Sequence, residues 1–86
     1  GMAGRWRSMY HLQIGRLYEE KFKEQLDDVV YELARHYART REHQKTVHYS
    51  IRAAEKAEAS YALQEAMNLY WQALSALENL GARADH

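Results

Sequence analysis

The sequence has no cysteine and no proline among its 86 residues, and only four glycines. The lack of cysteine excludes a disulfide scaffold, a cysteine-based zinc site and a thiol nucleophile. Three of the glycines (Gly1, Gly4 and Gly81) lie near the ends, so the middle of the chain holds almost no residue that breaks a helix. These absences favour long helices and argue against a sheet or barrel fold.

The chain also has no excess of either charge and no long apolar run. Twelve Lys and Arg balance twelve Asp and Glu, whereas nucleic-acid-binding proteins usually present a basic face. No apolar run reaches the length of a membrane span, and no apolar stretch follows Arg5 and Arg7 to complete a signal peptide. We therefore expect no nucleic-acid partner, no membrane partner and a cytoplasmic location.

What the chain does contain is a large apolar share. Apolar residue types make up 47% of it, with seven Tyr, two Trp and one Phe, which is enough for the core of one small domain. Their spacing in steps of three and four is helical almost from end to end. The sequence therefore predicts an all-α fold of about four helices, over residues 5–19, 24–40, 43–59 and 62–80.

The links between these segments are short, so neighbouring helices are expected to pack antiparallel as hairpins. Thr40 and Ser60 are expected to cap helix starts, and Gly81 is expected to cap a helix end in the left-handed conformation. The charged segment 19–25 contains no Gly or Pro. Two alternatives therefore stay open there: the first two helices either separate or run together as one.

The expected domain spans residues 5–81 as a single helical-repeat unit. Residues 1–4 are expected to precede it as a tag remnant or disordered start, because Gly1 before Met2 is typical of tag cleavage. Residues 82–86 are expected to form a frayed tail.

Each expected helix carries one apolar stripe. In the first helix Trp6, Met9, Tyr10 and Leu17 are expected to share a face with the other apolar residues of that segment. In the fourth, a stripe combines alanines with large side chains. It consists of Leu63, Ala66, Met67, Tyr70, Ala73, Leu74 and Leu77.

An internal repeat links the third and fourth helices. Residues 46–54 align with residues 66–74, with small residues at the first and eighth places and apolar residues at the second and fourth. Repeated helical hairpins are typical of solenoids. The pattern resembles the tetratricopeptide repeat, whose bulky, Leu, small and aromatic places are taken by Val30, Leu33, Ala34 and Tyr37. Ser50 is smaller than the motif prefers, and the closing proline of the motif is absent.

A narrower resemblance rests on a His-x-x-Ile-Gly start and a Leu-Ala-x-His-aromatic helix. Their places are filled by His11, Ile14, Gly15, Leu33, Ala34, His36 and Tyr37. These strings resemble the helical repeat region C-terminal to the ATPase module in large bacterial signalling proteins. Examples are class III nucleotide cyclases fused to an AAA-type ATPase and large ATP-binding transcriptional regulators. The resemblance implies a piece of a larger signalling or regulatory protein. Arg41 stands where such repeats usually have Gly.

Four residues are candidates for protein binding. The tetratricopeptide resemblance implies that a peptide binds the inner face of the first helix of a repeat, which here carries Tyr31, Arg35 and Arg39. The two arginines are suited to a carboxylate or an acidic peptide. Trp71 is the fourth candidate, because Trp is enriched at binding hot spots. The alternative for all four is an ordinary solvated or boundary position.

No catalytic, cofactor or metal site is predicted. His36, His43 and His48 are spaced by seven and five, unlike the i, i+4 pair of helical zinc sites. No grouping of nucleophile, base and acid is recognisable. We therefore expect a protein that is not an enzyme. A helix-turn-helix DNA-binding protein and a small helical-bundle metal protein remain as alternatives.

The predicted function is a non-catalytic protein-interaction or oligomerisation module acting as a scaffold in signalling. A solenoid of fewer than three repeats exposes its end faces, since each hairpin needs a neighbour to bury its apolar stripe. The expected partner is another protein or a second copy of the chain, and a homodimer is the commonest outcome of self-association.

Overall fold

The computed structural model describes residues 2–84, and they form an all-α fold of four α-helices and one 3-10 helix. The elements are α1 (Met2–Lys21), η1 (Leu26–Val29), α2 (Val30–Tyr37), α3 (His43–Ala59) and α4 (Leu63–Ala84). No strand occurs between residues 2 and 84, which confirms the predicted class and helix number. None of the helices in this range is long and apolar enough to cross a membrane.

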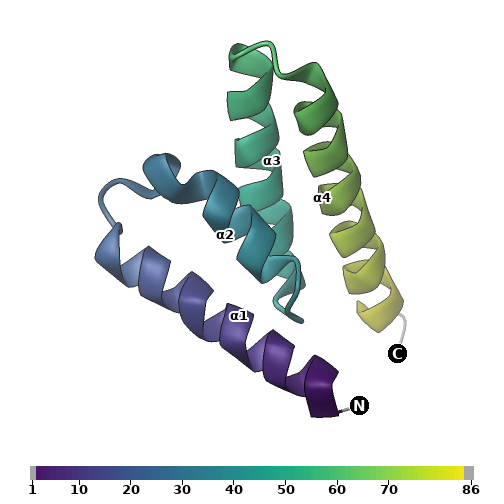
Figure 1. Ribbon diagram of the computed structural model, residues 1–86. Helices are drawn as coiled ribbons and strands as arrows, with labels where there is room; N and C mark the ends of the chain where they lie inside the picture. Colours follow the sequence, from purple (N-terminus) through teal and green to yellow (C-terminus); the bar gives the residue numbers. More distant parts are fainter. Residues whose placement is uncertain (1, 85–86) are drawn as a thin grey trace.

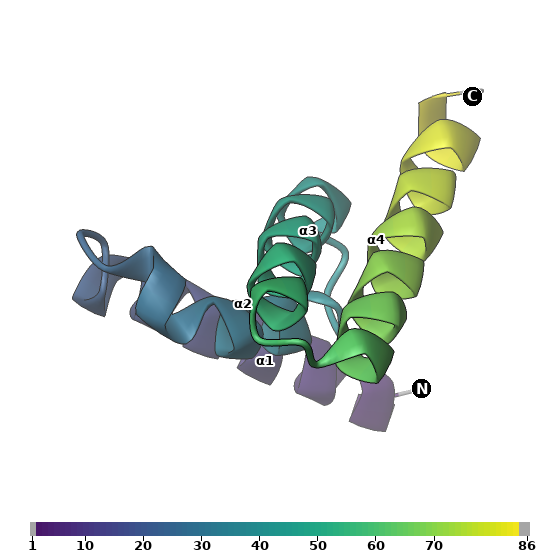
Figure 2. The ribbon, with the colours of Figure 1, turned by 90° about the horizontal axis from the view of Figure 1, so that it is seen from above.

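Helices that follow one another in the chain also pack side by side. α2 turns back along α1, and α3 and α4 form an antiparallel hairpin on the other side of α2 (Figure 1). Seen from above, α1 lies below α2, and α4 flanks α3 (Figure 2). The row of helices measures 38 × 30 × 21 Å, so much of each outer helix faces solvent.

The core is centred on the short helix α2. Val30, Leu33, Ala34 and Tyr37 are buried at steps of three and four, as the sequence period predicts. Tyr49 of α3 stacks on Tyr37, with ring centroids 5.7 Å apart. α2 can bury so much of its surface because it is covered by α1 on one side and α3 on the other.

Small residues form the contact between α3 and α4. The buried alanines of this hairpin are Ala53, Ala54, Ala57, Ala66, Ala73 and Ala76. Gln72 of α4 reaches past them and donates hydrogen bonds to the Ala34 carbonyl oxygen at 3.1 Å and to Ser50 Oγ at 2.8 Å. One amide therefore joins α2, α3 and α4.

The turn after α3 differs from the predicted one. Ser60 ends α3 and does not cap α4, and Tyr61 adopts the left-handed conformation with φ of 60°. The Tyr61 amide donates to the Glu58 carbonyl oxygen at 2.9 Å, and the Ala62 amide to that of Ala57 at 2.8 Å. This pair of bonds is the Schellman motif, which usually places Gly where Tyr61 stands.

The predicted cap at Gly81 is wrong. α4 continues through Gly81 to Ala84, and no glycine in the described residues has a positive φ. Nothing lies within 4 Å of a Cβ atom built at Gly81, so no neighbouring element forces the chain out of the helical conformation there. Residues 82–84, expected in a frayed tail, are helical, and residues 85–86 lie outside the described part.

The first two helices are separated by a link at residues 22–25, so one of the two alternatives left open by the sequence applies. α1 ends at Lys21, and η1 begins at Leu26, so the first two helices are separate. α1 begins at Met2, and residues 2–4 belong to it instead of preceding the fold, while Gly1 is not described. α1 therefore begins three residues before the predicted start at residue 5.

The turn between α2 and α3 needs no left-handed residue. Tyr61 is the one non-glycine residue of the described range with a positive φ, so Arg41 carries no such strain. Thr40 stabilises this turn: its Oγ1 donates to the Tyr37 carbonyl oxygen at 2.7 Å and accepts from the Glu42 amide at 3.1 Å. The residue before α3 is Glu42, so Thr40 braces the turn and is not the N-cap.

Candidate interaction surfaces

The outer face of α4 carries a continuous row of large exposed apolar side chains. The row consists of Leu63, Met67, Tyr70, Trp71, Leu74 and Leu77. Trp71 is 63% exposed, and Leu63 is 64% exposed. The predicted stripe of α4 is thus divided by the structure, because its alanines pack on α3 and its large residues point outward.

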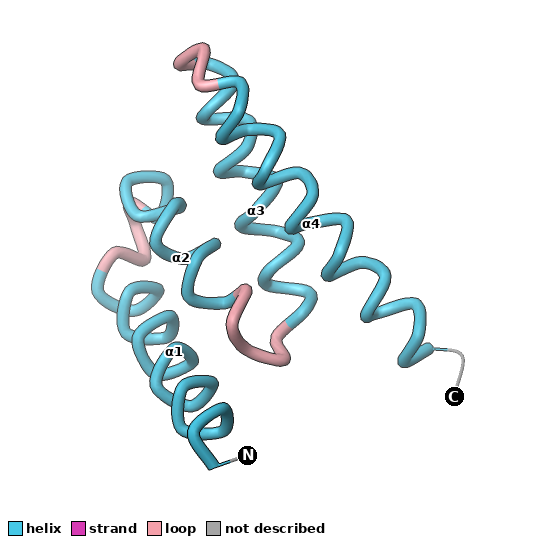
Figure 3. Tube along the Cα trace, turned by 45° about the vertical axis from the view of Figure 1, so that its right-hand side comes forward, coloured by secondary structure: helices cyan, strands magenta, loops and turns pink. Residues whose placement is uncertain are grey.

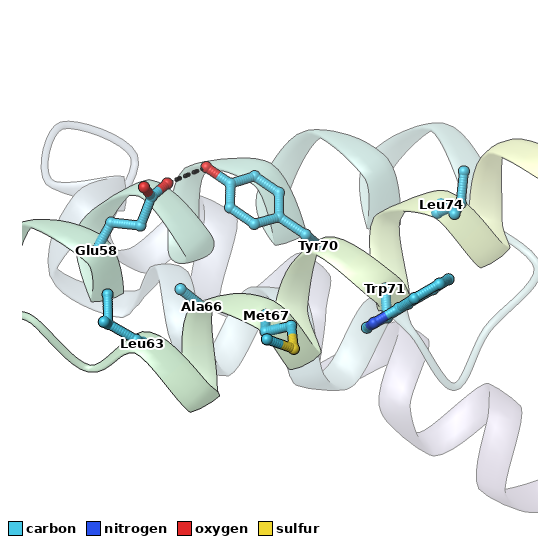
Figure 4. Close-up of a pocket in the computed structure, with 7 residues that line it drawn as sticks. All are labelled: Glu58, Leu63, Ala66, Met67, Tyr70, Trp71 and Leu74. Atoms are coloured by element: carbon cyan, nitrogen blue, oxygen red, sulfur yellow. Dashed lines mark hydrogen bonds between the residues drawn. The ribbon is translucent and has the colours of Figure 1, made fainter.

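Five of these residues, with Glu58 and Ala66, form a groove of about 360 Å³ along the α3–α4 hairpin. We call it the α4 groove; its lining is Glu58, Leu63, Ala66, Met67, Tyr70, Trp71 and Leu74 (Figure 4). Glu58 supplies the only charge in this lining, and it accepts a hydrogen bond from the Tyr70 hydroxyl. That bond, with the nearby charge of Glu55, raises the pKa of Tyr70 to about 12. The groove is therefore apolar with an acidic rim.

The predicted residues Tyr31, Arg35 and Arg39 lie together along a second groove, between α2 and α4. Its volume is about 360 Å³, and the rest of its lining is Glu32, Glu65, Asn68, Leu69 and Gln72. Neither arginine has a carboxylate within 4.0 Å among residues 2–84, and Arg39 donates to the carbonyl oxygen of Arg35 at 3.1 Å. We call this surface the α2 groove.

The structure does not bring Trp71 to the other three candidates. Trp71 lines the α4 groove, whereas Tyr31 lines the α2 groove. Lys56 Nζ lies 5.4 Å from the centroid of the Tyr31 ring. Burial raises the pKa of Tyr31, and the charges of Glu65 and Asp27 add to it. Glu32 and Glu65 line the α2 groove beside the two arginines, so the groove is mixed in charge.

A third exposed surface lies on α1. The structure divides the predicted stripe of α1, since Trp6 is 67% exposed and Leu17 is 65% exposed, whereas Tyr18 of the same stripe packs on the core. The side of α1 that packs on α2 also carries Leu12 and Gly15. Gly15 has no side chain, so the buried side of α1 gives only a weak apolar signal in the sequence.

Polar contacts hold α1 in this orientation. The carboxylate of Glu19 accepts hydrogen bonds from the hydroxyls of Tyr37 and Tyr49 and from Lys45 Nζ, the last at 2.8 Å. Burial opposes ionisation of Glu19, but these three donors outweigh it and lower its pKa. Burial and hydrogen bonding to the same carboxylate raise the pKa of Tyr37 and of Tyr49. The cluster therefore fixes a charged carboxylate between α1, α2 and α3.

A second polar contact joins His11 and His36 across the α1–α2 interface. Their Nδ1 atoms are 2.7 Å apart, so one ring donates and the other accepts. Burial lowers the pKa of both rings, and the charges of Arg35 and Arg39 lower them further. Two neutral rings satisfy this geometry, whereas two protonated rings would place donor against donor.

Within residues 2–84, no three His, Asp or Glu side chains are close enough to hold a metal ion, and His36 faces His11 instead of His43 or His48. Comparisons with protein-family models, curated proteins and solved structures gave no match to this chain. The tetratricopeptide resemblance therefore remains a prediction from the sequence.

Proposed function

We propose that this chain is a non-catalytic protein-interaction module that binds its partner through the α4 groove. The observation that carries the proposal is the exposed apolar row of α4, with Met67, Trp71 and Leu74 at its centre. The six side chains are 39–64% exposed and adjoin one another along α4. Contiguous exposed apolar patches of several hundred Å² or more usually mark a binding surface.

Burial of this row supplies the binding energy in the proposal. Full burial of a large apolar side chain is favourable by about 1.5–3 kcal/mol. The side chains of the row are already partly covered, so a partner must cover the whole row to offset the cost of association. Trp71 is the expected hot spot, because a large aromatic ring in the middle of an apolar groove is desolvated completely on binding.

The α2 groove is a second candidate surface for the same function. Arg35 and Arg39 present guanidinium groups that no carboxylate of the described residues neutralises within 4.0 Å. Tyr31 supplies an aromatic wall beside them. We propose that this groove takes an extended peptide segment with a carboxylate placed at the two arginines. Arg35→Glu should then weaken peptide binding, whereas Arg52→Glu, outside the groove, should not.

We propose that the chain acts as a scaffold within a larger signalling or regulatory protein, as the sequence resemblance implies, and that it lies in the cytoplasm. The residues that carry the narrower resemblance pack on one another across the α1–α2 interface, where Gly15 lies against Tyr37 and His11 contacts His36.

Site-specific photo-crosslinking tests the α4 groove directly. A photoreactive amino acid at Met67 should give a discrete protein adduct in cells that produce the chain, and Trp71→Ala should abolish that adduct. The control places the same group at Lys23, an exposed residue of the first link. If the adduct at Met67 is no stronger than at Lys23, the α4 groove binds no protein and the proposal fails.

A further inference from the structure

Two exposed apolar faces lie on the two outermost helices of the row. One is the α4 groove, and the other is a face of α1 with Trp6, Tyr10 and Leu17, spaced by four and seven residues. We call the latter the α1 face. α2 and α3 lie between α1 and α4 (Figure 3), so the two faces do not cover each other within one molecule.

The N-terminal half of the α1 face and the α4 groove carry opposite charges. The charged residues of α1 before Glu19 are Arg5, Arg7 and Arg16, of which Arg16 lies 3.9 Å from Glu42. Arg5 and Arg7 flank Trp6 in the chain and are exposed. The α4 groove has the reverse sign, since Glu58 lines it and Glu55 is close enough to raise the pKa of Tyr70. Glu78 follows Leu74 by four residues, and therefore lies on the same side of α4.

We propose that the α1 face of one copy docks in the α4 groove of a second copy, head to tail. This names the partner for the proposed function and rests on it. The apolar rows meet, and the arginines around Trp6 face the carboxylates of the groove rim. The alternative pairing of two α4 grooves about a two-fold axis would bury the same apolar surface but would bring acidic rim against acidic rim, which is unfavourable.

The lengths of the two helices suit a stable interface, which buries roughly 800 Å² per partner. α1 has 20 residues and α4 has 22, so the two helices can lie along each other for most of their length. Contacts of this head-to-tail kind leave one face open at each end and therefore build rings or open chains.

Two complementary variants test the proposal with purified chain. Trp6→Ala with Tyr10→Ala removes the α1 face, and Met67→Ala with Trp71→Ala removes the α4 groove. All four side chains are largely exposed, so the fold should persist, and circular dichroism checks it. The measurement is molar mass by light scattering behind size exclusion over a concentration series.

We expect the wild-type mass to rise with concentration beyond that of a dimer, while each variant alone remains a monomer. An equimolar mixture of the two variants should form a heterodimer and nothing larger, because it contains only one intact pair of faces. If Trp6→Ala with Tyr10→Ala, which lacks the α1 face, forms a dimer alone, then two α4 grooves pair with each other and the proposal is overturned. A mixture of the two variants that stays monomeric would overturn it as well.

Charge reversal on α1 is a second, independent test of the proposed docking. Arg5→Glu with Arg7→Glu should weaken self-association about tenfold, because like charges then meet at the groove rim. Lys23→Glu is the matched control and should leave association unchanged, because Lys23 lies in the first link, beyond the end of α1. Equal effects of both changes would overturn the charge argument. A wild-type chain that stays monomeric, but still gives the adduct at Met67 with another protein, would refute this inference and leave the proposed function intact.

Discussion

The ring of Tyr37 lies directly against the backbone of α1 at Gly15. A Cβ atom at Gly15 would come within 2.8 Å of the ring carbons Cε2 and Cζ, closer than real Cβ contacts allow. Tyr37 is fully buried and stacks on Tyr49 from the other side, so its ring has little room to retreat. The absence of one side chain therefore sets how closely α1 approaches α2.

Gly15→Ala should destabilise the fold by about 1–2 kcal/mol, because the overpacking at Tyr37 exceeds the gain in helix propensity. Gly81→Ala is the matched control: Gly81 is also helical, and nothing lies within 4 Å of the added Cβ. It should stabilise α4 by up to about 1 kcal/mol. Urea unfolding followed by circular dichroism measures both, and two changes of the same sign would contradict the packing argument.

Tyr61→Gly should stabilise the protein by about 1 kcal/mol. Tyr61 has φ of 60°, a conformation that Gly adopts without steric cost, and its side chain is 87% exposed and so loses few contacts. Ser60→Gly is the control, since Ser60 has φ of −97° and gains nothing from Gly. A lower melting temperature for Tyr61→Gly than for the wild type would show that Tyr61 makes contacts that outweigh its strain.

Glu19→Gln should lower the free energy of unfolding by about 2–3 kcal/mol at neutral pH, since a half-buried carboxylate with three donors is lost. Because the pKa of Glu19 is lowered on folding, its contribution is complete above its ordinary pKa of 4.5 and is lost as the pH falls through the folded value. The gap between wild type and variant should therefore close in acid. Glu20→Gln, whose side chain is 79% exposed, should change stability by less than about 0.5 kcal/mol at any pH.

Stability should also fall on mild acidification because of His11 and His36. Their pKa values lie below the ordinary 6.5 in the folded protein, so the unfolded chain takes up protons first. The contribution of this histidine pair to the free energy of unfolding is complete above pH 6.5 and is lost as the pH falls toward the pKa values of the folded protein. His11→Gln should reduce this loss, whereas His48→Gln, exposed on α3, should not. The loss of stability is measured as the difference between the unfolding free energies at about pH 7.5 and about pH 5.5. If His11→Gln shows the same loss as the wild type, the histidine contact is not the source of that loss.

The helices themselves could be predicted because their signal is local. The predicted bounds 43–59 match α3, and 62–80 starts one residue before α4. The face spacing of Tyr31, Arg35 and Arg39 is local as well, so these three residues do line one groove. The charge that Glu65 adds to that groove was not predictable, because Glu65 belongs to α4, whereas Glu32 comes from α2 itself.

The orientation of α1 could not be predicted from its period. Trp6, Tyr10 and Leu17 form the stronger apolar signal, yet the packed side contains Gly15, whose role depends on the Tyr37 ring from another helix. The buried side of α4 could not be predicted for the same reason. The alanines and the large residues of α4 form one stripe in the sequence, and only the close approach of α3 selects the alanines for burial.

The sequence by itself determined four helices, an all-α class and an apolar stripe on each helix, because hydrophobic spacing and the scarcity of helix breakers act over a few residues. The tertiary structure alone decided which stripes are covered. Burial depends on the shape of the neighbouring helix, which accepts Ala73 at the α3 contact and leaves Trp71 outside. The surfaces from which we infer function are the apolar faces that the four helices leave uncovered.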